Sequence, residues 1–135
     1  MNREELKKIL PHREPMLLLD EVVLEGEKAL GQITIKGDEY FLQGHFPGNA
    51  VVPGVILCEM LGQSACILIP ELLEGKTPYF VGIKEAKFRA PVKPGDTLKT
   101  EVTLEKVRRN FVFVNAKGYV DGKCCVEASL SFTCQ

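Results

Sequence analysis

Residues 53–70, PGVILCEMLGQSACILIP, decide the fold of this chain. Placed on a helix, their apolar side chains are distributed around the whole circumference, and a helix that is apolar on every side is buried on every side. Pro53 suits the opening of such a helix and Pro70 its end. The sequence therefore predicts one long buried helix from Gly54 to about Pro70.

The segments on either side of this helix alternate apolar and polar residues, as β-strands do. Asp121-Gly122 predicts a tight hairpin between the last two strands. A long loop over 37–53 is rich in glycine and proline. We expect a short helix over 2–10 and strands over 16–19, 22–24, 29–36, 79–83, 86–89, 97–107, 111–120 and 123–133.

Most of these strands are joined by short turns, so we expect an α+β fold in which an antiparallel sheet curls around the helix. The length of 135 residues is that of one domain, predicted over residues 1–135. A single sheet cannot cover every side of so apolar a helix. A second copy of the chain could cover the rest, so a homodimer is expected.

Composition narrows the classes of function. The net charge of −1 argues against a nucleic-acid-binding surface, and no apolar run approaches the length of a membrane span. The charged N-terminal stretch does not resemble a signal peptide. The five cysteines include no Cys-x-x-Cys pair, which favours reduced thiols and a cytoplasmic location. Neither of the two histidines has further ligands at metal-site spacing, so no metal is expected.

Glu59 is the charged residue in the middle of the helix, where helical spacing places it on one face with Gly62, Gln63 and Cys66. It could reach solvent at a gap in the packing, since acidic residues are rarely buried unpaired. If it is buried instead, the loss of water favours its neutral, protonated form, which suits a general acid.

His45 lies in the loop Gln43-Gly44-His45-Phe46-Pro47-Gly48. It could simply order this turn, which is the commoner role of a lone loop histidine. The flanking glycines and proline also give the backbone a tight path that can present the imidazole rigidly. An imidazole exchanges protons near neutral pH, so it can act as a base.

The amides of Gly54 and Val55 open the predicted helix and have no intrahelical acceptor. They could stabilise negative charge on a carbonyl oxygen. A base, a carboxylic acid, such amides and an apolar surround together suit removal of a proton α to a carbonyl with loss of a β-hydroxyl group.

The motifs Gly44-His45-Phe46-Pro47-Gly48, Pro53-Gly54-Val55, Glu59 and Gln63 closely resemble those of the β-hydroxyacyl-acyl-carrier-protein dehydratases of bacterial type II fatty acid synthesis. The likeness extends to residues 10–13, 80–96, 120–123 and 127–128, and so spans nearly the whole chain.

This resemblance implies a hotdog fold, a dimer or a trimer of dimers, no cofactor, and acyl carrier protein as the partner that brings the substrate. It implies that His45 of one subunit handles the α proton and that Glu59 of the other handles the β-hydroxyl, directly or through water. Gly54 would supply an amide to the thioester oxygen, and Gln63 would orient Glu59. Tyr79 matches the tyrosine that gates the acyl tunnel, and Phe80 follows it. His12 is expected to fix the N-terminal turn.

Several basic side chains could steer an acidic carrier protein, although ordinary solvated charges are the better interpretation of any one of them. They are Arg13, Lys84, Lys87, Arg89, Lys93, Arg108 and Arg109.

Two other functions compete with the lyase. A hotdog thioesterase would hydrolyse the same thioester, but it gives no reason for the His45 loop. A non-catalytic acyl-binding subunit would tolerate loss of either His45 or Glu59, and the presence of both weakens that hypothesis.

Overall fold

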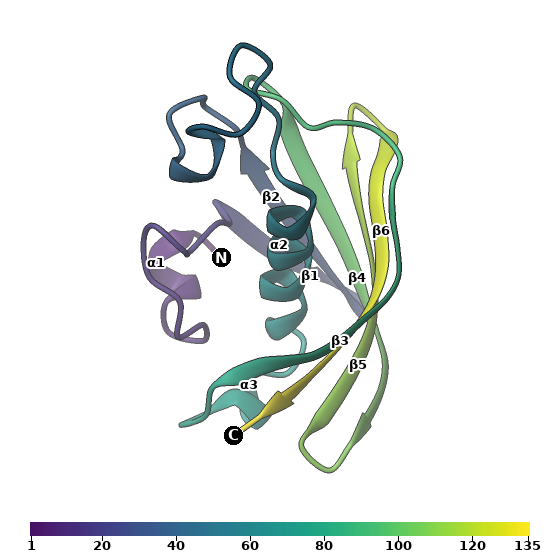
Figure 1. Cartoon of the computed structure of the whole chain (residues 1–135). Helices are drawn as coiled ribbons and strands as arrows, with labels where there is room; N and C mark the ends of the chain where they lie inside the picture. The colour runs from purple at the N-terminus through teal and green to yellow at the C-terminus, as the bar shows by residue number, and fades with distance from the viewer.

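The computed structural model covers residues 1–135 and consists of one six-stranded sheet curled around a central helix (Figure 1). The sheet order is β1-β2-β4-β5-β6-β3, and every neighbouring pair is antiparallel. The predicted α+β architecture is thus confirmed. The elements are α1 (Arg3–Leu6), β1 (Glu21–Glu25), β2 (Lys28–Thr34), η1 (Tyr40–Leu42), α2 (Gly54–Cys66), α3 (Pro70–Leu73), β3 (Pro78–Phe88), β4 (Thr97–Arg108), β5 (Phe111–Val120) and β6 (Lys123–Cys134).

The central helix α2 ends at Cys66, earlier than the expected end near Pro70. A residue before proline is disfavoured in helical conformation, and Ile69 accordingly has φ −135° and ψ 48°. The amides of Ile67, Leu68 and Ile69 each bond to a carbonyl three residues earlier, which tightens the last turn. Pro70 then occupies the first turn of α3, so this proline also begins a second helix.

The N-terminal expectations were partly wrong. The helix predicted over 2–10 is the short α1, whose N-terminus is closed by a capping box between Asn2 and Glu5. Residues 16–19 form no strand, although Leu17, Leu18 and Leu19 are buried. A short apolar run indicates burial but does not by itself settle the backbone conformation.

The strands predicted over 79–83 and 86–89 form the single strand β3, whose pairing with β6 is irregular between Phe80 and Gly82 and again between Lys84 and Lys87. The Asp121-Gly122 hairpin is confirmed. Both residues have positive φ, 50° and 77°, as a type I′ turn requires.

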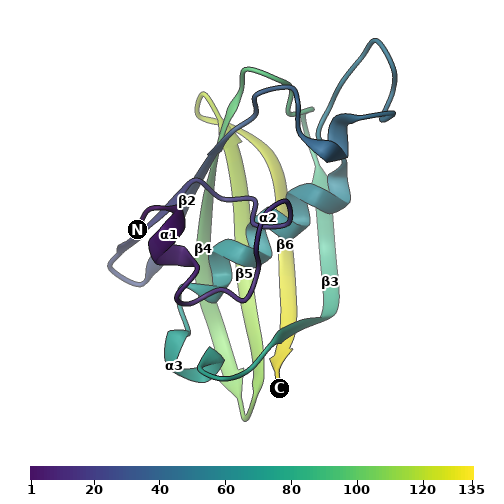
Figure 2. The same ribbon diagram turned by 90° about the vertical axis from the view of Figure 1, so that its left-hand side faces the viewer.

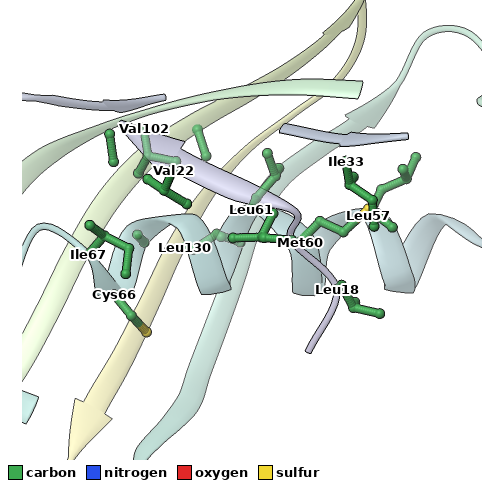
Figure 3. Packing of buried hydrophobic residues seen from close by; sticks show 14 of the residues in the cluster. Leu18, Val22, Ile33, Leu57, Met60, Leu61, Cys66, Ile67, Val102 and Leu130 are labelled. Carbon is green, nitrogen blue, oxygen red and sulfur yellow. The ribbon is translucent and has the colours of Figure 1, made fainter. Parts of the chain in front are cut away.

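One face of α2 packs into the concave side of the sheet, mainly against β4 and β5 (Figure 1). Met60, Leu61 and Ala65 have no exposed surface, and Figure 3 shows Met60 and Leu61 among side chains of the sheet. A single cluster of 32 buried residues runs from Leu6 to Cys134. One domain over residues 1–135 stays a prediction. No helix of the chain combines the length and the apolar character that crossing a membrane requires.

Gly31 interrupts the apolar alternation of β2 because a buried polar cluster occupies the space in front of it. Its amide donates to Thr100 Oγ1 (3.0 Å), which lies 2.7 Å from Ser64 Oγ. A Cβ atom on Gly31 would lie 2.4 Å from the former oxygen and 2.7 Å from the latter.

We therefore expect Gly31→Ala to lower the free energy of unfolding by about 1–3 kcal/mol, as overpacking of a core does. Denaturant unfolding followed by circular dichroism measures this. Gly26→Ala is the control, because a Cβ there meets nothing within 4 Å and only its φ of 62° opposes the change. An unchanged midpoint of unfolding for Gly31→Ala would contradict this expectation, because it would show that the core can accommodate the added methyl group.

Candidate functional site

Glu59 lies on α2, and two side-chain contacts hold its carboxyl group, one from Gln63 and one from His12. Gln63 Nε2 donates to Glu59 Oε2 at 2.9 Å and to the carbonyl of Met16 at 2.7 Å. Gln63 Oε1 in turn accepts from the amide of Leu18 at 3.0 Å. Gln63 is thus fixed to the segment before β1, and it holds one oxygen of the carboxyl group. The carboxyl side chain is only partly buried, with 22% exposed.

The second contact comes from His12, whose Nε2 lies 3.3 Å from Glu59 Oε2. His12 precedes β1 in the chain and was expected only to fix the N-terminal turn. Its Leu10-Pro11-His12-Arg13 context gave no signal for this contact, because no sequence spacing relates position 12 to a helix that begins at Gly54. His12 is the residue of this site that sequence reasoning missed.

A small pocket of about 40 Å³ opens beside Glu59. Its volume suits a water molecule or two and is far below that of a pocket for an acyl group. Cys66 is one of its walls, and burial raises the pKa of the Cys66 thiol, so this sulfur behaves as an apolar surface and not as a nucleophile. The lining residues are His12, Glu59, Gly62, Gln63, Cys66, Pro78, Phe80 and Phe132.

His45 lies in the loop before α2, which projects from the end of the molecule where α2 begins (Figure 2). Its Nδ1 lies 2.9 Å from the carbonyl oxygen of Val51. A carbonyl only accepts, so Nδ1 carries the hydrogen and Nε2 keeps a free lone pair. The Phe46 ring stacks on the imidazole with centroids 4.2 Å apart. Gly44 and Gly48 have φ of 79° and 82°, which accounts for the glycines beside this histidine.

The loop leads directly into the first turn of α2, so His45 and the Gly54 and Val55 amides belong to the same end of the helix. Neither amide donates a hydrogen bond to the rest of the protomer. Gly54 has a steric role as well, because a Cβ atom there would lie 2.9 Å from the Phe88 ring. The ring therefore covers the start of the helix.

Strand β3 is an edge of the sheet and lies along α2 with its apolar side chains exposed. Phe88 contacts Gly54, and Phe80 approaches Gly62 so closely that a Cβ there would lie 2.7 Å from the ring. Tyr79 is 55% exposed and does not line the pocket beside Glu59. The exposed apolar residues along β3 are Tyr79, Phe80, Val81, Ile83 and Phe88.

The predicted site residues thus form two groups in one protomer. Glu59, Gln63 and Phe80 meet at the small pocket, whereas His45 lies with Gly54 and Val55 at the start of α2. No hydrogen bond or ion pair joins His45 to Glu59 within the chain.

Comparison with solved structures of similar backbone identifies the fold. A chain of "The Dehydratase Heterocomplex ApeI:P from Xenorhabdus doucetiae" has a TM-score of 0.81 at 19% identity, covering 95% of this chain and 89% of that one. A hypothetical thioesterase protein with coenzyme A from Streptococcus pneumoniae TIGR4 has a TM-score of 0.63 at 14% identity, covering 85% and 84%. Identities this low establish the fold alone, and this fold is the predicted hotdog fold.

The sequence comparisons are more specific. The FabA-like domain model matches residues 10–129, and the chain belongs to this family. The curated 3-hydroxyacyl-acyl-carrier-protein dehydratase FabZ of Ligilactobacillus salivarius is 50% identical over 132 residues, covering 95% of this chain and 94% of the relative. The protein of the same name from Oenococcus oeni is 45% identical over 136 residues, covering 98% of both chains.

Proposed function

We propose that this chain is a hydro-lyase of fatty acid biosynthesis that converts β-hydroxyacyl-acyl-carrier-protein to the trans-2-enoyl thioester, with His45 of one protomer and Glu59 of its partner as the acid–base pair. The dehydration itself rests on the FabZ relatives, which are 50% and 45% identical over nearly the full chain. The assignment of residues rests on the chemistry of the two groups in the site.

The reaction needs one base and one acid. His45 Nε2, with its free lone pair, removes the α proton, and the C–H electron pair becomes the α–β double bond. The β-carbon–oxygen bond breaks with its electron pair, and the leaving oxygen takes a proton from Glu59 and departs as water. Negative charge that develops on the thioester oxygen is stabilised by the free Gly54 and Val55 amides. Transfer of the proton from His45 to Glu59 through water then returns both groups to their starting protonation states.

One observation supports a site built from two protomers. Each chain contains both His45 and Glu59, yet the two side chains make no contact with each other. The pocket of about 40 Å³ beside Glu59 cannot hold an acyl chain. The apolar edge strand β3 borders this pocket through Phe80, and a long exposed apolar edge strand favours pairing with another chain. A homodimer joined along β3 would bring in a second His45 loop and would enclose an apolar channel.

The partner that delivers the substrate is proposed to be acyl carrier protein. Two basic residues that could have steered it have internal partners instead. Arg13 donates to the carbonyls of Lys7, Leu10 and His12, and Arg89 pairs with Glu127 at 2.7 Å. Docking is therefore proposed for the remaining five residues of the basic set. The trimer of dimers and the cytoplasmic location stay predictions.

A single assay separates the lyase from a thioesterase and from a binding subunit. Supplied with a β-hydroxyacyl-acyl-carrier-protein, the protein is expected to form the enoyl thioester, measured by its ultraviolet absorbance, while a thiol reagent detects no free carrier-protein thiol. A control with the same amount of enzyme and no substrate gives the signal of the enzyme's five cysteines, which is subtracted. Release of thiol in step with turnover would favour the hydrolase, and no change in either signal would favour the binding subunit.

A further inference from the structure

His12 makes a contact that a residue fixing a turn would not need. Its Nε2 lies 3.3 Å from Glu59 Oε2, although the two residues come from separate elements. The His12 and Glu59 side chains are 21% and 22% exposed, so the contact is only partly shielded in one protomer. An apolar partner surface laid along β3 would shield it further, and shielding strengthens such a contact.

Both protein contacts of the Glu59 carboxyl group use the same oxygen. Gln63 Nε2 donates to Oε2 at 2.9 Å, and His12 Nε2 lies near the same atom. Glu59 Oε1 takes part in no hydrogen bond or ion pair. Gln63 Nε2 and His12 Nε2 therefore hold Oε2 in place, whereas Oε1 is free to contact a substrate.

The other ring nitrogen of His12 indicates where its hydrogen lies. Nδ1 is buried and has no hydrogen-bond partner. A hydrogen on Nδ1 would be a buried donor without an acceptor, which is rarer in proteins than an unsatisfied acceptor. The arrangement favours the neutral tautomer with its hydrogen on Nε2, facing the carboxyl group.

We propose that His12 is a positioning residue for Glu59: with Gln63 it holds Oε2, so that Oε1 is the atom that exchanges a proton with the substrate's β-hydroxyl group. This inference rests on the proposed acid role of Glu59. When Oε1 gives up its proton, negative charge appears on the carboxylate, and an N–H beside Oε2 stabilises a charged acceptor more than a neutral one. The contact therefore favours the transition state over the bound substrate, and its loss lowers kcat more than it raises KM.

The test compares two replacements of His12 in the intact protein. His12→Phe keeps a ring of similar shape without an N–H, and we expect kcat to fall about 10- to 100-fold, the range for a hydrogen bond to a charged group, with KM changed less than about threefold. His12→Gln keeps an N–H at similar reach and is expected to recover most of kcat. Thermal unfolding and molar mass are measured for both variants.

The inference is overturned if His12→Phe keeps the wild-type kcat, or if a folded, dimeric His12→Gln is as slow as His12→Phe, because packing alone would then explain the residue. Failure of the proposed acid role of Glu59 gives a different result. In that case Glu59→Gln itself would remain active, whatever the His12 variants do.

Discussion

His45→Ala and Glu59→Gln are each expected to lower the kcat of dehydration by about 10²- to 10⁴-fold, the range that positioned acids and bases contribute. Both side chains lie outside the main core, so the folded state should survive either change. Glu59→Gln keeps the size of the side chain and can no longer give up a proton. Steady-state formation of the enoyl thioester measures the loss, and retained turnover in either variant would remove that residue from the mechanism.

Mixing the two inactive variants tests whether the site spans two protomers. In a heterodimer of the two variants, one site carries both changes and the other carries neither, because a two-fold axis relates the sites. Random exchange of subunits makes half of the dimers mixed, so about one quarter of wild-type activity should return. The control is each variant exchanged with itself, which should stay inactive. If His45 and Glu59 act within one chain, the mixture recovers nothing.

The architecture could be predicted because the spacing of apolar residues along the sequence indicates which side chains are buried. The apolar residues of 53–70 required a helix covered on all sides, and the alternation in 97–107, 111–120 and 123–133 matched β4, β5 and β6 closely. The same signal failed at residues 16–19. Their leucines are buried as expected, but the amide of Leu18 donates to the side chain of Gln63 instead of to a neighbouring strand.

The site was predictable only in part, for a related reason. His45, Glu59 and Gln63 could be picked out because their local settings are unusual, with glycines around one and apolar residues around the others. The contact of His12 with Glu59 depends on how the segment before β1 folds back across α2, and no pattern in a single sequence encodes that approach. Gly54 was expected for its free amide, but its closeness to the Phe88 ring became visible only in three dimensions.

Val81→Asp is expected to separate the proposed dimer and abolish activity without touching a catalytic side chain. Val81 is 55% exposed on the edge strand β3, so a two-fold interface along β3 would contain this residue from both subunits. Like charges facing each other at an interface cost several kcal/mol, which weakens self-association by about a hundredfold or more. Light scattering after gel filtration should give the mass of one chain.

The matched control is Val23→Asp, because Val23 is 50% exposed on β1, the opposite edge of the sheet. It places the same charge on the same residue type in the same kind of strand, and it should keep both the dimer and its turnover. If Val81→Asp remains dimeric and active, β3 is not the interface. If it is monomeric and still active, one protomer contains the complete site. Loss of activity together with the dimer is the outcome that follows if each pocket beside Glu59 needs the partner subunit.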